Sequence, residues 1–314
     1  MPYANLNAEL MKTETNYSPA VICYGEILWD VLPDGPQPGG APLNVAYHLH
    51  KLGVGTSLIS RIGNDPNGAA LAGLMKGWGL DKSLLQTDEQ HDTSQVLARM
   101  NNGNEVSYEI VYPVAWDFIS ENTVLAAQVS AAKYLVYGSL ASRNEVSRQT
   151  LFRLLDNTSA IRVFDINLRP PFISRALLEV LLGKSDIVKF NEAELDVVQV
   201  MFGGYYQGET DKVHFIQDKF DVQEVIVTKG EFGASYYTDQ AFHIWSTAIK
   251  VMDTIGSGDA FLAAFISSHF NGLQPQEILK NAVGMGGFIA TKKGGCPGYS
   301  LSEYQNFKNQ LFDQ

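Results

Sequence analysis

Short apolar runs alternate with stretches of helical periodicity from Val21 onward, and no other feature narrows the choice of fold as far. The apolar runs are rich in β-branched and aromatic residues, and we predict strands at Val21–Tyr24, Ser57–Ile62, Tyr134–Tyr137, Arg162–Asp165, Ile187–Phe190 and Glu224–Thr228. The stretches between them predict helices at Pro42–Leu52, Gly68–Gly77, Glu145–Leu155, Phe172–Leu182 and Ala193–Phe202. This alternation predicts an α/β fold with a mostly parallel central sheet and helices on both faces.

One stretch departs from the alternation. Ser94–Met100 and Glu105–Tyr112 look like strands, and the Asn-Gly pair in the segment Asn101–Asn104 between them is a strong hairpin signal. Together with the proline- and glycine-rich segment Pro33–Gly40, this hairpin predicts a small β flap beside the main sheet. The alternative is a surface hairpin without a role in function.

Charge and composition exclude several classes of protein. The 314 residues include 34 acidic and 23 basic side chains, a net charge of -11 that argues against a nucleic-acid partner. Two cysteines cannot form a disulfide framework or a metal cluster, which fits a reducing compartment. Residues 1–20 read as a polar leader without the features of a secretory signal, and no apolar stretch is long enough to span a membrane. We expect one domain at residues 21–314 and a cytoplasmic location.

The most informative segment is Asp253–Ala260, in which glycines precede a stretch of helical composition. Glycines that open a helix expose backbone N–H groups at the positive end of the helix dipole, where anions bind. The carboxylate of Asp259 would repel a bound phosphate, so a general base that accepts a proton from a hydroxyl explains it better. The alternative is a capped helix start in which the glycines form only a tight turn.

Polar clusters follow three of the predicted strands: Asp165–Arg169, Lys189–Glu194 and Thr228–Gly233. In a parallel sheet these clusters lie along the edge formed by the carboxyl ends of the strands, where open α/β sheets bind ligands. Any one of them could be a solvated loop, but three in succession favour a ligand-binding edge.

The start of the chain adds Asp30, the pair Gly39–Gly40 and Asn44. Carboxylates and amides make paired hydrogen bonds to neighbouring hydroxyls, which suits a polyhydroxylated ligand. The alternatives are a loop carboxylate for Asp30 and a helix cap for Asn44.

In combination these motifs resemble the ribokinase-like sugar kinases, also called the phosphofructokinase B type. The match runs in order from about Val21 to the C-terminus and comprises Asp-Thr-x-Gly-x-Gly-Asp at 253–259, Gly39–Gly40 with Asn44, Asn191-x-x-Glu194, and Thr228-x-Gly230-x-x-Gly233.

The resemblance implies ATP-dependent transfer of phosphate to a sugar hydroxyl, with Asp259 as the base and an anion hole formed by the backbone of Gly256, Ser257 and Gly258. It also implies Mg²⁺ organised through water by Asn191 and Glu194, and a nucleotide surrounded by Thr228, Gly230, Gly233 and Asn281. Members of the family commonly bind a monovalent cation, usually K⁺, and Asp253 lies in the corresponding region.

The sugar side follows from the same resemblance. Asp30, Gly39, Gly40 and Asn44 correspond to sugar-contacting positions of the family. Segments 28–40 and 93–117 would form a lid that covers the sugar and pairs two subunits into a homodimer. A closed lid excludes water, which would otherwise hydrolyse ATP.

The choice of sugar depends on Phe164–Pro171 and on Gly39–Ala46, which are most similar to the fructokinase branch. Within Phe164–Pro171, Arg169 would contact the sugar or a phosphate, with a salt bridge at the sheet edge as the alternative. The 2-keto-3-deoxygluconate kinases share the Asp-x-Asn-x-Arg pattern, and Tyr112–Asp117 lacks a basic residue that fructokinases carry. We predict a fructokinase acting on the free sugar, with 2-keto-3-deoxygluconate kinase or ribokinase as alternatives. A non-catalytic sugar- or nucleotide-binding regulator is the alternative from another class.

Overall fold

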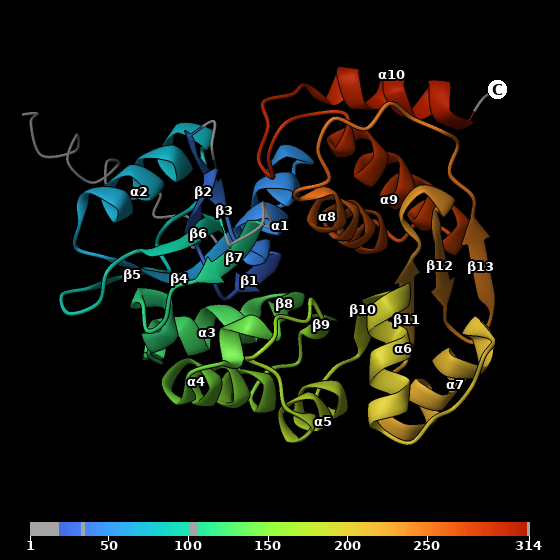
Figure 1. Ribbon diagram of the computed structural model, residues 1–314, viewed down its shortest axis with the longest axis horizontal. Helices are drawn as coiled ribbons and strands as arrows, with labels where there is room; N and C mark the ends of the chain where they lie inside the picture. The colour runs from blue at the N-terminus through green and yellow to red at the C-terminus, as the bar shows by residue number, and fades with distance from the viewer. Residues whose placement is uncertain (1–18, 33–34, 101–105, 313–314) are drawn as a thin grey trace, which may run out of the picture.

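The computed structural model describes residues 19–32, 35–100 and 106–312 (Figure 1). Its strands are β1 Val21–Tyr24, β2 Leu28–Leu32, β3 Gly35–Gly39, β4 Thr56–Gly63, β5 Leu85–Asp88, β6 Ser94–Met100, β7 Val106–Ile110, β8 Tyr134–Gly138, β9 Ile161–Asp165, β10 Ile187–Asn191, β11 Glu224–Thr228, β12 Ala234–Tyr237 and β13 Ala241–Ile244. Its α-helices are α1 Ala41–Lys51, α2 Pro66–Trp78, α3 Thr123–Ala131, α4 Glu145–Asp156, α5 Arg175–Gly183, α6 Glu192–Met201, α7 Glu209–Phe220, α8 Ser257–Phe270, α9 Pro275–Ala290 and α10 Leu301–Phe312. Short 3₁₀ helices lie at η1 Ala115–Phe118, η2 Leu140–Ser142 and η3 Gly230–Phe232.

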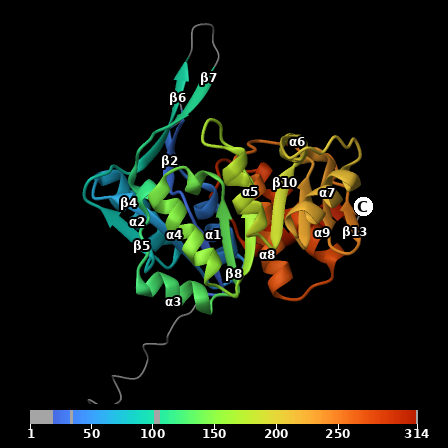
Figure 2. The ribbon, with the colours of Figure 1, turned by 90° about the horizontal axis from the view of Figure 1, so that it is seen from below.

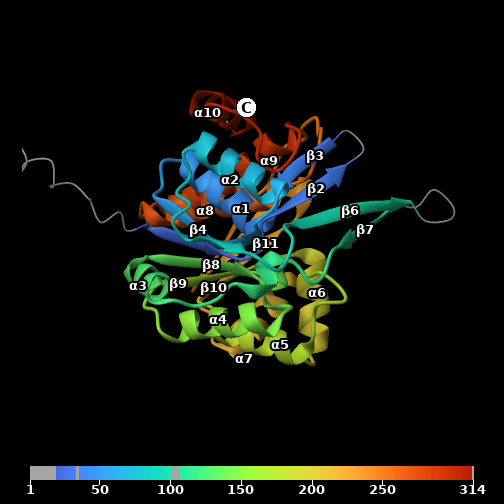
Figure 3. The ribbon, with the colours of Figure 1, turned by 90° about the vertical axis from the view of Figure 1, so that its left-hand side faces the viewer.

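The large sheet has nine strands in the order β13-β12-β11-β10-β9-β8-β1-β4-β5. Neighbours from β11 to β5 pair in parallel, whereas β12 and β13 are antiparallel. Helices α1, α2, α8, α9 and α10 cover one face, and α3 to α7 cover the other (Figure 3). Alternate residues of β1 therefore enter different cores: Val21 and Cys23 pack on one side, Ile22 and Tyr24 on the other. Burial on both faces explains why these strands read as continuous apolar runs.

The predicted α/β class is confirmed, and so is every strand and helix predicted for the main sheet, to within a few residues. The largest difference is at α5, which begins three residues later than expected because the Ser174 hydroxyl caps it, accepting a hydrogen bond from Leu177 N–H at 3.2 Å. Sequence analysis did not predict α3, α7, α9, α10, β5, β12 or β13. Among the described residues, no helix combines the length and apolar character needed to cross a membrane.

A second sheet of four strands, in the order β3-β2-β6-β7, stands beside the first. The predicted hairpin is confirmed as the antiparallel pair β6–β7, which projects from the body of the molecule (Figure 2). The proline-rich segment becomes β3, an edge strand, where a missing N–H costs no ladder bond. The predicted turn at Asn101–Asn104 and residues 1–18 of the predicted leader lie outside the described residues.

A buried ion pair fixes the base of this second sheet. Arg143 donates to both carboxylate oxygens of Asp117, at 2.7 and 2.8 Å, and to the carbonyl of Val111 just beyond β7, at 2.7 Å. The side chains of Arg143 and Asp117 are fully buried, and the guanidinium stacks on the ring of Trp116. The end of the hairpin is thereby tied to η1 and to the main body.

Candidate active site

The candidate site lies where the carboxyl ends of the parallel strands face the N-terminus of α8. Asp165 ends β9, Asn191 ends β10 and Thr228 ends β11, as the polar clusters of the sequence predicted. A Cβ placed on Gly258 at the start of α8 would lie 3.6 Å from Lys189 Nζ of β10, so the helix start approaches the sheet edge closely. The structure therefore brings the glycine motif and the strand-end clusters to one place.

The helix start has the geometry of an anion site. Gly256 precedes α8 with φ 74, in the left-handed region. The first helical hydrogen bond runs from Ala260 N–H to Gly256 O at 2.8 Å, so the N–H groups of Gly258 and Asp259 precede the helical ladder. The N–H of Ser257 donates to Thr254 O at 3.2 Å within the turn. Its predicted part in an anion hole stays a prediction.

Asp259 is partly exposed at this helix start and is held by Asn44, whose Nδ2 donates to Asp259 Oδ2 at 2.8 Å. Burial raises the pKa of Asp259 to about 6, and the charge of Asp165 adds to the rise. The hydrogen bond from Asn44 and the charges of Lys189 and Arg169 act in the opposite direction. A carboxylate with this pKa is ionised at pH 7 and still basic enough to accept a proton.

A buried ion pair that sequence analysis did not single out lies beneath Asp259. Lys189 and Asp165 are register neighbours on β10 and β9, and Lys189 Nζ donates to both carboxylate oxygens at 2.9 Å. Both side chains are almost fully buried. Burial alone would lower the pKa of Lys189, but Asp165, with smaller contributions from Glu194 and Asp259, raises it. Lys189 is therefore a fixed positive charge below the site.

Asn191 and Glu194 form a capping box at the start of α6. Asn191 Oδ1 accepts from Glu194 N–H at 2.8 Å, and Glu194 Oε2 accepts from Asn191 N–H at 2.9 Å. Glu194 Oε1 also accepts from Leu168 N–H at 3.0 Å, and burial raises the pKa of this carboxyl. Each oxygen keeps a lone pair that a water molecule could use, and the water-mediated contact with Mg²⁺ stays a prediction.

The predicted sugar-contacting residues lie on β2, at the end of β3 and at the start of α1, and Asn44 of this set bonds Asp259. Asp30 on β2 packs so closely against Gly39 that a Cβ there would lie 2.2 Å from Asp30 Oδ2. Burial raises the pKa of Asp30 to about 6, and the Arg169 guanidinium partly offsets this. Arg169 is exposed, and its charge acts on both Asp30 and Asp259. Gly40 comes directly before α1, where a Cβ would lie 2.4 Å from Glu26 O.

The residues predicted to surround the nucleotide differ in the contacts that they make within the protein. Thr228 donates to Phe190 O at 3.2 Å, Gly230 lies at φ 55, and Gly233 lies at φ 93 against Ile244. Both ends of the Asn281 amide take part in helix packing, with Ser268 Oγ at 3.1 Å and Lys308 Nζ at 2.8 Å. These contacts lend no support to a role for Asn281 at the nucleotide, which stays a prediction.

Asp253 joins two loops. Its Oδ1 accepts from Ile255 N–H at 3.0 Å and its Oδ2 from Gly294 N–H at 2.9 Å. In the described part of the chain, no cluster of three or more His, Cys, Asp or Glu side chains is arranged to hold a metal ion. The predicted monovalent cation at Asp253 would need backbone carbonyls as its other ligands, and it stays a prediction.

Glu26 is a second feature that sequence analysis left without a role. It is 2% exposed, it precedes β2, and its Oε2 has no hydrogen-bond partner in the structure. Burial raises its pKa to about 7, while hydrogen bonds from backbone N–H groups, including that of Ala41, and the charge of Arg169 act to lower it. The charge of Asp259 raises it further, so Glu26 belongs to the electrostatic surroundings of the base.

Replacing Glu26 by Gln is expected to stabilise the fold more at high pH than at low pH. The folded-state pKa of about 7 exceeds the ordinary glutamate value of 4.5, so the folded protein loses stability as the pH rises between these values. Glutamine carries no charge, and its gain in unfolding free energy should be about 2–3 kcal/mol larger at pH 8 than at pH 5. Urea unfolding at the two pH values measures this difference, with Glu277→Gln at an exposed position of α9 as the control. An equal gain at both pH values would contradict it.

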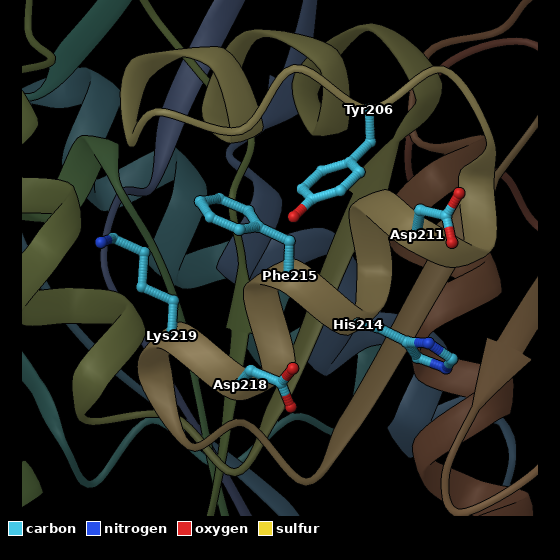
Figure 4. Close-up of a pocket in the computed structure, with 6 residues that line it drawn as sticks. All are labelled: Tyr206, Asp211, His214, Phe215, Asp218 and Lys219. Carbon is cyan, nitrogen blue, oxygen red and sulfur yellow. The ribbon is translucent and has the colours of Figure 1, made fainter.

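One surface hollow, with a volume of about 400 Å³, lies away from this site (Figure 4). It is lined by α7 and the segment before it, through Tyr206, Asp211, His214, Phe215, Asp218 and Lys219. None of these residues carries a motif of the sequence, and the hollow is open to solvent. The candidate site therefore rests on the geometry around Asp259.

Comparison with known proteins agrees with this geometry. The sequence profile described as "pfkB family carbohydrate kinase" matches residues 34–300. The chain is 30% identical over 293 residues to a fructokinase from Escherichia coli, covering 86% of this chain and 92% of the relative. It is 29% identical over 309 residues to a fructokinase from Salmonella typhimurium, covering 92% of this chain and 97% of the relative.

Solved structures of sugar kinases also match this chain over most of its length. The fructokinase from Vibrio cholerae O395, with fructose, ADP and calcium ion bound, matches with a TM-score of 0.78 and 26% identity over 93% of this chain and 99% of that one. An uncharacterised sugar kinase from Pyrococcus horikoshii in complex with ATP matches with a TM-score of 0.76 and 26% identity, over 90% of this chain and 96% of that one.

Proposed function

Because the chain belongs to the pfkB family of carbohydrate kinases, we propose that it transfers the γ-phosphate of ATP to the primary hydroxyl of free fructose, giving fructose 6-phosphate. The observation that carries this proposal is the position of Asp259 at the start of α8, with Asn44 on one oxygen and a pKa near 6. The fructokinases among its relatives supply the choice of sugar.

In the proposed reaction Asp259 accepts the proton of the attacking hydroxyl as the new oxygen–phosphorus bond forms and the bond to the ADP oxygen breaks. Asn44 occupies Oδ2, so we assign the hydroxyl to Oδ1. The N–H groups of Gly258 and Asp259 precede the helical ladder and would stabilise charge on the transferring phosphoryl oxygens. The charge of Lys189 lowers the pKa of Asp259 and so favours its ionised form.

For the cofactors, we propose that Asn191 and Glu194 hold Mg²⁺ through water, and that Asp253 lies beside K⁺. Bound Mg²⁺ would neutralise charge on the ATP phosphates. The nucleotide would lie near Thr228, Gly230 and Gly233, with Asn281 the least supported member of the predicted set.

The basic side chains Arg61 and Lys51, near the proposed sugar site, already have partners within the protein, which favours a free sugar over a phosphorylated one. Arg61 is engaged by Asp88, at 2.7 Å, and by Phe118 O, at 3.0 Å. Lys51 lies over the ring of Tyr299. Arg169 is exposed at the site, and we assign it with Asp30 to the hydroxyls of the sugar.

The second sheet is the proposed lid, within a kinase domain that spans residues 21–314. Strands β2 and β3 carry Asp30 and Gly39 at its base, and β6 and β7 project beyond them (Figure 2). We propose that the sheet covers the sugar and pairs two copies of the chain in the cytoplasm. Light scattering at working concentration tests the pairing, and a monomeric mass would reject it.

The test of the function is ADP release with ATP and Mg²⁺ over fructose, ribose, 2-keto-3-deoxygluconate, adenosine and fructose 6-phosphate, with and without K⁺. We expect preferential turnover of fructose. Activity confined to another sugar would reject the assignment made from Arg169 while retaining Asp259 as the base. A folded protein that turns over none of them would reject the kinase proposal in favour of a sugar- or nucleotide-binding regulator.

A further inference from the structure

His48 is a fully buried histidine on α1, one helical turn beyond Asn44. Its Nε2 lies 2.9 Å from Gly295 O and its Nδ1 lies 3.0 Å from the hydroxyl of Tyr299. A carbonyl oxygen only accepts, so Nε2 carries the proton and Nδ1 accepts from the tyrosine. Burial lowers the pKa of His48 to about 4, so the ring is neutral at the pH of the proposed reaction.

The carbonyl that His48 binds belongs to the 294–297 loop between α9 and α10. Tyr47, next to His48, donates to Pro297 O at 2.6 Å, and Asp253 accepts from Gly294 N–H at 2.9 Å. The loop is therefore attached to α1 on one side and to the segment before α8 on the other. In Figure 1 this part of the chain, in red, passes beside α1.

The loop touches two parts of the proposed catalytic apparatus. A Cβ on Gly256 would lie 2.5 Å from Gly295 Cα, so the loop backbone packs directly against the start of α8. A Cβ on Gly295 would lie 2.7 Å from Asn44 Nδ2, the atom that bonds Asp259. Cys296 completes the contact by donating to Asn44 Oδ1 at 3.2 Å.

We propose that His48 is a positioning residue: through Gly295 it holds the 294–297 loop against Gly256 and Asn44, and so fixes Asp259 relative to the helix start. His48 touches no reacting group and acts only through the loop. This inference rests on the proposed kinase function for its catalytic consequence, whereas the state of the loop can be measured without any turnover.

Two replacements of His48 separate the two hydrogen bonds. Glutamine places an amide nitrogen near the position of Nε2 and keeps a donor for Gly295, whereas asparagine reaches only the position of Nδ1 and loses it. We expect His48→Asn to lower kcat about tenfold, as the loss of one buried hydrogen bond predicts, with both KM values within about twofold of wild type. His48→Gln should restore most of kcat. His50→Gln, on the same helix but against Gly79, is the matched control.

Labelling of Cys296 reports on the loop directly, and Cys23 serves as the reference. Burial and the charge of Asp259 raise the pKa of Cys296 well above its usual value, so we expect slow alkylation by a maleimide in the wild type. His48→Asn should accelerate labelling of Cys296 about tenfold, because the loop loses one of its attachments. Cys23 is fully buried in β1, and mass spectrometry of its peptide provides the internal reference.

Each outcome decides the inference. Faster Cys296 labelling in His48→Asn, with kcat lowered and then rescued in His48→Gln, supports it. Unchanged labelling, equal loss of kcat in both variants, or parallel labelling of Cys23 would overturn it, the last because it indicates general loosening. If the wild type phosphorylates no sugar, the kinase proposal fails, and the labelling of Cys296 still decides whether His48 holds the loop.

Discussion

Asp259→Asn is expected to reduce turnover by about 10²–10⁴-fold while leaving nucleotide binding nearly unchanged. The asparagine oxygen can still accept the hydrogen bond from Asn44, so the geometry of the site is retained while the base is lost. Steady-state ADP release gives the turnover, and calorimetric titration with ATP gives the binding. Asp218→Asn in the hollow on α7 makes the same chemical change away from the site and should be neutral. Near-normal turnover in Asp259→Asn would remove Asp259 from the mechanism.

The same carboxylate sets the pH dependence. Asp259 must be ionised to accept a proton, and its pKa of about 6 lies above the ordinary aspartate value of 3.8. We therefore expect kcat/KM of the wild type to decline as the pH falls through about 6, and this decline should be absent from the residual activity of Asp259→Asn. Asp30 and Glu26 have pKa values of about 6 and 7, so profiles of Glu26→Gln and Asp30→Asn identify their contributions. A decline centred near pH 4 would contradict the role of burial.

The six inner strands of the main sheet could be predicted because each leaves a local pattern, whereas β5, β12 and β13 at its two ends were not predicted. Strands buried on both faces, such as β1 and β11, read as short apolar runs, and their predicted ends match the structure. The parallel pairing of β2 with β6 joins residues far apart in the chain, and no local pattern specifies it. The sequence therefore indicated that both pieces belong to one small β flap, but not the order or register of its strands.

In the candidate site, too, contacts between side chains far apart in the chain leave no local pattern in the sequence. Strand-end clusters predicted which polar groups would meet, but the pairing of Lys189 with Asp165 depends on the register of β10 and β9. The contact of Asn44 with Asp259 spans 215 positions in the chain. In contrast, Asn191-x-x-Glu194 carries the spacing of a capping box, a signal that was present in the sequence and that the family resemblance led us to interpret only as a magnesium site.

Lys189→Met is expected to destabilise the fold by about 3–5 kcal/mol at pH 8, because it leaves the buried carboxylate of Asp165 without its partner. The ammonium bonds both oxygens of Asp165, and both side chains are less than 10% exposed. Urea unfolding measures the loss of stability, and Lys184→Met at the more exposed pair with Asp156 should cost no more than about 1 kcal/mol.

The double variant Lys189→Met, Asp165→Leu separates stability from catalysis. Replacing a buried ion pair by apolar side chains of similar size is often close to neutral, so most of the stability should return. The pKa of Asp259 depends on both charges, since Asp165 raises it and Lys189 lowers it. In the single variant the acid decline of kcat/KM should therefore move above pH 6, and in the double variant it should move back, because the opposing charges are removed together. A profile of Lys189→Met that coincides with wild type would show that Lys189 supports the fold alone.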